Sequence, residues 1–116
     1  MTAPSDFPSD ENGQILRKLQ ESGDALDQPR MIDFTFAFPQ RQQAIAFAEL
    51  VDEPDFEVRI SRYEQREMWQ VVVSRYMIPN HTEITAIEFD LAARAESVGG
   101  DADGWACMVV KHAKET

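Results

Sequence analysis

Residues 31–38 alternate between apolar and other side chains, and this pattern predicts the central strand of the protein. The apolar members of the alternation are Ile32, Phe34, Phe36 and Phe38. Successive side chains of a strand point to opposite faces, so these four would share one face. Three aromatic rings form a large apolar surface that other elements must cover. Pro39 ends the strand because it has no N–H for a ladder, and we expect an interior strand with one buried face.

The spacing of apolar residues predicts the other elements in the same way. Helices are expected over residues 12–22, 40–51 and 80–98. Further strands are expected over residues 56–61, over residues 69 to about 78, and, after a loop at residues 101–104, over residues 105–110. The third helix has Asn80 or Thr82 as its cap, and Gly99 and Gly100 end it.

This order of elements predicts a ferredoxin-like α+β sandwich, β-α-β-β-α-β with an extra N-terminal helix. Right-handed crossovers give an antiparallel four-stranded sheet in the order 4-1-3-2, with two helices over the phenylalanine face. The other sheet face would be open and mostly polar. Residues 1–10, which contain two prolines and few apolar residues, are expected to form a flexible tail. Residues 11–116 are expected to form a single domain.

Composition and charge narrow the classes of partner. The formal net charge of the 116-residue chain is −10, from 21 acidic and 11 basic residues. This charge argues against direct nucleic-acid binding, which needs clustered Lys and Arg. It suits a basic protein segment as partner or no charged partner at all, and a solvated acidic surface is the simpler interpretation. No apolar run approaches a membrane span, and the N-terminus lacks the features of a signal peptide. With a single cysteine, the chain is expected to be cytoplasmic.

No catalytic motif, cofactor site or metal site is predicted. His81 and His112 would lie at one end of the sheet, where a zinc ion would need a third ligand such as Asp33 or Asp55. Two unrelated surface histidines are the simpler interpretation, because the sequence has no metal-ligand spacing. Cys107 lies in an apolar stretch with no neighbouring base, which favours packing over nucleophilic catalysis.

Two groups of carboxylates are candidate contact residues for a protein partner. Asp52, Glu53 and Asp55 would lie at one end of the sheet, and Asp101 and Asp103 at the other. Either group could receive a basic peptide, although Asp is also common in ordinary loops. Trp105, beside the second group, is either a contact residue or part of the core.

Three short stretches resemble the RraB family of regulators of ribonuclease E activity. They are Asp103-Gly104-Trp105, Pro29–Phe34 and Phe56-Glu57-Val58, within an agreement in element order over residues 10–110. The resemblance implies a small acidic cytoplasmic protein that binds ribonuclease E and inhibits RNA cleavage without being an enzyme. Asp55 departs from the glycine that is usual in the family, and Lys111 and Lys114 stand where inhibitor-type members have an acidic tail.

Three functional hypotheses follow from these observations. The first is a non-catalytic regulator that binds ribonuclease E or another RNA-degrading enzyme. The second is a small-molecule-binding or enzymatic ferredoxin-like domain, because that fold hosts many functions. The third is self-association through the open sheet face or an edge strand.

Overall fold

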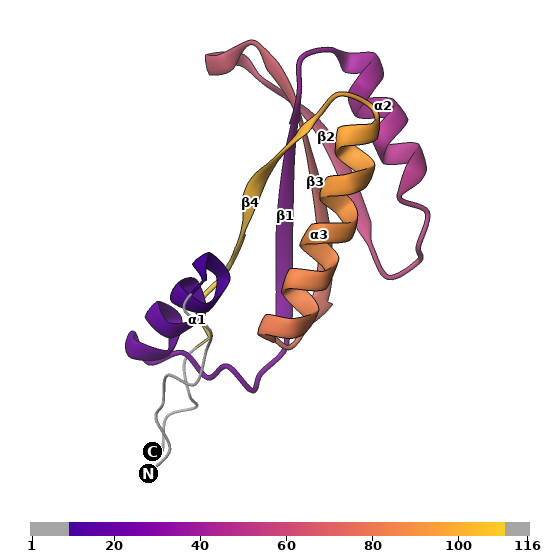
Figure 1. The fold of residues 1–116 in the computed structure, drawn as a ribbon. Coiled ribbons are helices and arrows are strands. Elements are labelled where there is room, and N and C mark those ends of the chain that lie inside the picture. The colour runs from indigo at the N-terminus through magenta and orange to yellow at the C-terminus, as the bar shows by residue number, and fades with distance from the viewer. Residues whose placement is uncertain (1–9, 111–116) are drawn as a thin grey trace.

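Three α-helices and one four-stranded antiparallel sheet form a mixed α+β fold in the part of the chain that the computed structural model describes, residues 10–110 (Figure 1). The elements are α1 (Glu11–Glu21), β1 (Arg30–Phe38), α2 (Arg41–Leu50), β2 (Glu57–Tyr63), a short 3₁₀ helix η1 (Glu64–Arg66), β3 (Met68–Met77), α3 (His81–Ser97) and β4 (Asp101–Cys107). The strand order is β2-β3-β1-β4, so the predicted interior position of the phenylalanine-rich strand is confirmed. None of the helices within this range is long and apolar enough to cross a membrane.

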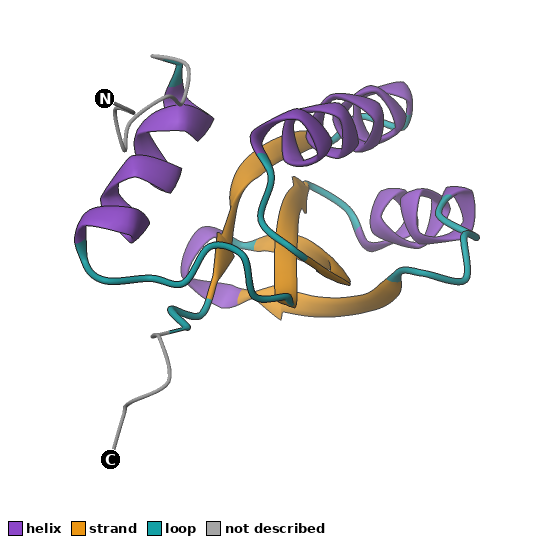
Figure 2. Cartoon of the chain, turned by 90° about the horizontal axis from the view of Figure 1, so that it is seen from below, coloured by secondary structure: helices purple, strands orange, loops and turns teal. Residues whose placement is uncertain are grey.

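The phenylalanine face of β1 forms the centre of the core. Phe34, Phe36 and Phe38 are at most 1% exposed, and α2 and α3 lie side by side over this face of the sheet (Figure 2). Phe47 of α2 contributes a fourth ring, whose centroid lies 5.0 Å from that of Phe36 and 5.3 Å from that of Phe38. These distances are typical of packed aromatic pairs. The predicted cover of two helices is therefore confirmed.

The opposite face of the sheet has the polar character expected from the alternation. Register pairs Asp33 with Ser74 and Thr35 with Val72 across β1 and β3. The Ser74 hydroxyl donates a hydrogen bond of 2.6 Å to the Asp33 carboxylate. Because cross-strand partners share a face, these four residues lie on the side away from α2 and α3.

Local capping signals fix both ends of α3. The Asn80 side chain accepts a hydrogen bond of 3.0 Å from the backbone N–H of Glu83. At the other end, Gly99 has a φ of 90°, and the N–H groups of Gly99 and Gly100 return to the carbonyls of Glu96 and Ala95. This is the Schellman arrangement, in which glycine takes the left-handed position. Of the two predicted caps, Asn80 and Thr82, Asn80 is the one observed, and the predicted stop at the two glycines is confirmed.

Helix α1 packs at the β4 side of the sheet and contacts α3 (Figures 1 and 2). Its Leu16 is fully buried in the main core. Asp10, which the sequence assigned to the tail, is the N-cap of α1 and accepts a hydrogen bond from the backbone N–H of Gly13. A carboxylate at this position satisfies a free N–H of the first turn, so Asp10 caps the helix that follows it. Residues 1–9 of the expected tail and residues 111–116 lie outside the described range.

Strand β4 starts earlier than the sequence predicted. Residues 101–104 were expected to form a loop and residues 105–110 a strand, but β4 spans Asp101–Cys107. Asp101 and Ala102 pair with Ala37 and Phe36, and the register shifts between Phe36 and Phe34. Residues 101–104 are exposed at the sheet edge, so they do not need to be apolar. The sequence therefore has no apolar alternation that would indicate a strand there.

Candidate protein-contact surfaces

The two predicted acidic groups lie at opposite ends of the sheet. Asp101 pairs with Ala37 near the end of β1. Residues 52–55 precede β2, whose first residue, Glu57, pairs with Ser74, which itself pairs with Asp33 near the start of β1. The structure therefore keeps the groups apart, and each must be considered as a separate surface.

Glu53 is already occupied by an intramolecular partner. The guanidinium of Arg94 on α3 donates two hydrogen bonds to the Glu53 carboxylate, at 3.0 and 2.6 Å, and a further one of 3.0 Å to the carbonyl of Leu50. It also bonds the Asp90 carboxylate at 2.8 Å. The hydrogen bonds from Arg94 lower the pKa of Glu53 to about 2. Glu53 therefore links the α2–β2 loop to α3, and its charge is largely neutralised for an external partner.

The remaining members of the first group are free at the surface. Asp52 and Asp55 are exposed, and neither forms an ion pair with another residue in the range 10–110. They flank Glu53 in a loop of the chain, so they present two unneutralised charges next to a neutralised one. This end of the sheet can attract a basic segment through Asp52 and Asp55 alone.

The second group lies along the exposed outer strand of the sheet. Asp101 and Asp103 are both exposed. Asp103 has Arg66 of η1 at 3.9 Å, with both side chains about half exposed, and such a surface pair is weak. Asp101 and Asp103 therefore remain accessible to a cationic partner.

Of the two roles left open for Trp105, contact residue or part of the core, the structure places it in the core. It is 7% exposed and lies opposite Phe34 on the helix-covered face. Its indole N–H donates a hydrogen bond of 2.8 Å to the side chain of Asn12 on α1. Asn12 in turn donates to Thr85 and Glu88 of α3, each at 3.1 Å. Trp105 thus joins β4 to α1, and through Asn12 to α3.

A glycine in β4 determines which way Trp105 points. Ala102 faces Phe36 and Trp105 faces Phe34, so three steps along β4 match two steps along β1. The extra residue is a β-bulge, and Gly104 within it has a φ of 90°. Without the bulge, residues 102 and 105 would lie on opposite faces. The Asp103-Gly104-Trp105 sequence therefore turns the tryptophan into the core.

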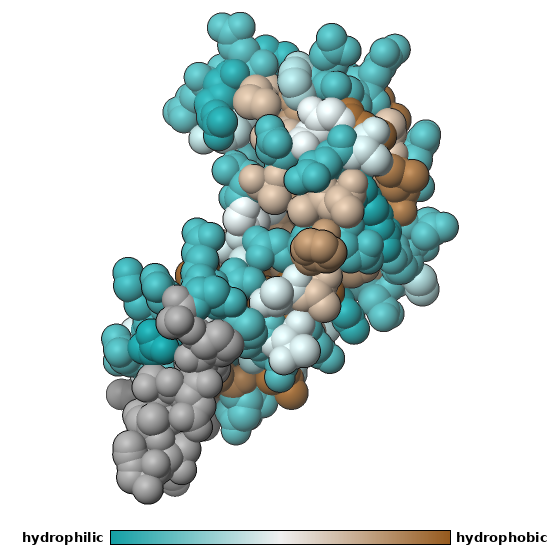
Figure 3. All heavy atoms as spheres, viewed as in Figure 1, coloured by the Kyte–Doolittle hydropathy of each residue, from teal (hydrophilic) through white to brown (hydrophobic). Residues whose placement is uncertain are grey.

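Phe89 is an exposed aromatic residue that the sequence interpretation missed. It lies on α3 and is 79% exposed, more than any other large apolar side chain in residues 10–110. The helix face seen in Figure 3 is mostly hydrophilic, with isolated apolar spots. The buried residues of α3 are Ile84, Leu91 and Ala95, and they form a stripe along the helix. Phe89 lies outside this stripe, and that position is the signal that could have identified it in the sequence. Exposed aromatic residues are frequent anchors in protein interfaces.

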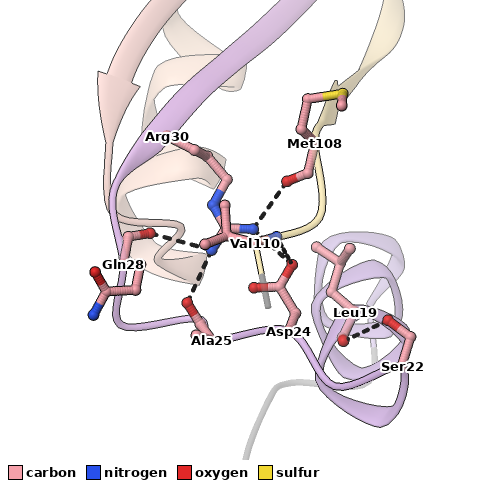
Figure 4. Close-up of polar contacts among 8 residues, drawn as sticks. All are labelled: Leu19, Ser22, Asp24, Ala25, Gln28, Arg30, Met108 and Val110. Carbon is pink, nitrogen blue, oxygen red and sulfur yellow. Dashed lines mark hydrogen bonds and ion pairs between the residues drawn. The ribbon is translucent and has the colours of Figure 1, made fainter. Parts of the chain in front are cut away.

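A buried ion pair holds the two ends of the described chain together (Figure 4). The Arg30 guanidinium donates to the Asp24 carboxylate at 2.6 Å and to the carbonyls of Ala25, Gln28 and Met108 at 2.9–3.1 Å. The Arg30 and Asp24 side chains are 4% and 0% exposed. The partnership raises the pKa of Arg30. The partners named here are all internal to the chain, which indicates a role in stability.

The groups considered for metal or thiol chemistry lie apart from one another. The His81 ring contacts the Asp10 carboxylate at 2.9 Å, and His112 lies outside the described residues. Within residues 10–110, no group of three or more His, Cys, Asp or Glu side chains is arranged to hold a metal ion. Burial raises the pKa of the Cys107 thiol, which disfavours the reactive thiolate.

Comparison with known protein families gives one match that covers most of the chain. The family model described as regulator of ribonuclease activity B, RraB, matches residues 9–107. This range contains all three helices and all four strands. No curated protein matches the chain.

Proposed function

The chain belongs to the RraB family of regulators of ribonuclease activity, and we propose on this basis that it regulates a ribonuclease by binding to it. The family match is the observation that carries the proposal. The proposed partner is ribonuclease E or another RNA-degrading enzyme, and we propose that the two proteins bind in the cytoplasm. The protein acts on this enzyme by contact and performs no catalysis of its own.

The charge distribution supports a basic segment as the binding partner. The chain has a net charge of −10, and Asp52, Asp55, Asp101 and Asp103 are exposed. Opposite potentials increase the rate of encounter and exclude like-charged partners. We propose that these four carboxylates receive the basic segment. Glu53 and Trp105 are left out of the contact, since Arg94 binds Glu53 and the core buries Trp105.

The exposed ring of Phe89 supports an apolar contact in addition to the electrostatic one. Its ring is exposed on α3, and Ala86 and Ala93, also exposed, lie three residues before it and four residues after it. Residues at these spacings share a helix face with Phe89. The ring therefore stands among small side chains and is accessible to a partner groove.

We also propose that the fold belongs to the ferredoxin-like class. The order β1-α2-β2-β3-α3-β4 after α1 and the strand order β2-β3-β1-β4 support this assignment. The fold itself does not identify the function, because unrelated activities share it.

Binding to the basic, disordered region of ribonuclease E tests the proposed function. Fluorescence anisotropy of a labelled peptide from that region should show binding at low salt that weakens as salt screens the charges. The same protein should slow RNA cleavage by ribonuclease E. No binding at low salt would contradict the proposal.

Matched variants separate local contact from the effect of total charge. D52N/D55N and D101N/D103N each remove two negative charges, as does the control D27N/E96Q, whose residues are exposed elsewhere. At least one acidic variant should weaken binding more than the control does. F89A should weaken binding about tenfold, as loss of an interface anchor does. Equal effects of all three charge variants would show that only net charge matters and would rule out these contact residues.

A further inference from the structure

Strand β2 leaves one side of its backbone unpaired. It is the outer strand in the order β2-β3-β1-β4, and β3 is its only pairing partner in the described part of the chain. Five of its seven residues are exposed, including Ile60, which is 38% exposed although it lies on the helix side. A free edge of this kind can pair with another strand.

Charge is distributed unequally along this edge. Carboxylates lie at its beginning, at Asp55 and Glu57, and arginines follow at Arg59 and Arg62. Although the chain has almost twice as many acidic as basic residues, neither of these arginines forms an ion pair within residues 10–110. The strand therefore has a negative end and a positive end, and Arg59 and Arg62 at the positive end have no carboxylate partner among the described residues.

The flank of α2 beside this edge has the same polarity. The guanidiniums of Arg41 and Arg62 both lie over the ring of Trp69, 5.7 and 5.5 Å from its centroid, which places the start of α2 beside the end of β2. Arg41, Ile45 and Ala48 follow at helical spacing along one side of α2, and Asp52 lies in the loop that follows the helix end at Leu50. Arg41 has no ion pair in the described residues, so α2 begins with a positive charge and the loop after it has a negative one.

We propose that β2 pairs antiparallel with β2 of a second copy of this chain, forming a symmetric dimer with a continuous eight-stranded sheet. Antiparallel pairing reverses the polarity of the second edge, so the negative end of each copy meets the positive end of the other. A surface that is complementary to itself is what a two-fold interface requires. Charges on an edge usually keep other strands away, but here their order favours this one arrangement.

One register satisfies both charge and packing. With Val58 on the two-fold axis, Glu57 lies opposite Arg59 of the second copy, and the reverse pair forms as well. Phe56 then lies opposite Ile60 of the second copy, which covers the exposed Ile60. Opposite charges and aromatic–aliphatic pairs at facing positions both stabilise antiparallel strands. Beyond the strand, Arg62 of each copy approaches the segment of the other that contains Asp52 and Asp55.

Charge reversal provides the test, with sedimentation velocity of the full chain as the measurement. The wild-type protein should associate reversibly, with a weight-average mass rising from 13.2 kDa toward twice that value as concentration increases. R59E and E57R should each abolish association, because like charges then face each other. The double variant E57R/R59E restores opposite charges and should recover it. An equimolar mixture of E57R and R59E should also associate, because each supplies the charge the other lacks.

Matched controls exclude a general effect of charge. R66E and E96R make the same changes of net charge at exposed positions outside the paired segment and should leave association unchanged. A wild-type protein that stays monomeric throughout overturns the proposal and leaves the edge to an extended segment of another protein. Association that survives R59E, or that neither the double variant nor the mixture recovers, also overturns it. The assay contains no ribonuclease, so its result is independent of the proposed function.

Discussion

At the scale of single residues, Glu53 shows how one ion pair makes stability depend on pH. Its pKa is about 2 in the folded protein, against a usual value of 4.5. A lowered pKa means that the stabilisation is complete above pH 4.5 and is lost as pH falls toward 2. The Glu53 side chain is 39% exposed, so screening by solvent limits the contribution to about 1 kcal/mol.

We therefore expect E53Q to lower the free energy of unfolding by about 1 kcal/mol at pH 7. The loss should be much smaller at pH 2, where about half of the wild-type carboxylate is already protonated. Urea unfolding at the two pH values measures this difference. D55N neutralises a carboxylate two residues away that forms no ion pair with any residue the structure describes, and it should have little effect at either pH. An equal loss for E53Q at both values would show that the charge of Glu53 does not contribute.

Asp24 is the opposite case, a charge whose neutralisation leaves another buried charge without compensation. Arg30 lies 2.6 Å away and is also buried. Loss of one partner of a buried pair costs about 3–5 kcal/mol. We expect D24N to lower the free energy of unfolding by about 3 kcal/mol in urea titrations, whereas D27N, at an exposed site in the same segment, should be close to neutral. A D24N value no larger than that of D27N would contradict this account of the pair.

At the scale of secondary-structure elements, the bulge in β4 determines how the outer strand joins the core. Gly104 has a φ of 90°, and an added Cβ would meet no atom within 4 Å. The effect of a side chain here is therefore conformational, with no steric clash. A non-glycine residue in left-handed backbone is destabilised by about 1–2 kcal/mol.

We expect G104A to lower the free energy of unfolding by about 1–2 kcal/mol in thermal or urea denaturation. D103A changes the neighbouring exposed residue, whose one ion pair within residues 10–110 is the long one to Arg66, and should change stability by less than about 0.5 kcal/mol. If G104A were neutral, the bulge would have to tolerate an L-residue, and the explanation for the orientation of Trp105 would be wrong.

At the scale of the whole molecule, the net negative charge would act on the proposed basic partner at long range, before any contact forms. The sequence isoelectric point is near 4.5, so the charge of −10 at pH 7 falls to zero between these values. Attraction for a basic segment should fall with it, because steering depends on the summed charge. The ion pair of Glu53 is maintained over this range, since its pKa is about 2.

If the proposed function holds, binding of the basic ribonuclease E peptide should therefore decrease steadily from pH 7 to pH 4.5 at constant ionic strength. Anisotropy titrations measure the binding, and near-ultraviolet circular dichroism on the same samples checks that the fold persists. Affinity that is unchanged at pH 4.5 while the protein stays folded would contradict an electrostatic basis for recognition.

The sequence by itself determined the features that depend on interactions between near neighbours. Alternation in residues 31–38 indicated a strand buried on one face, and Asn80 and the pair Gly99-Gly100 indicated where α3 starts and ends. These signals are readable because strand faces, caps and helix stops involve residues only a few positions apart. The family, too, was identified from short local motifs and the order of the elements.

Only the tertiary structure decided the features that join residues far apart in the chain. The bond from Trp105 to Asn12 spans 93 positions, and the bond from Arg94 to Glu53 spans 41. No periodicity encodes such pairs, because they depend on how whole elements pack and how far each side chain reaches. For this reason Trp105 became a core residue, Glu53 became an internal ligand of Arg94, and α1 found its place beside β4. In the same way, the sequence contains the opposite charges at the two ends of β2, but only the strand order shows that they lie on an outer edge of the sheet.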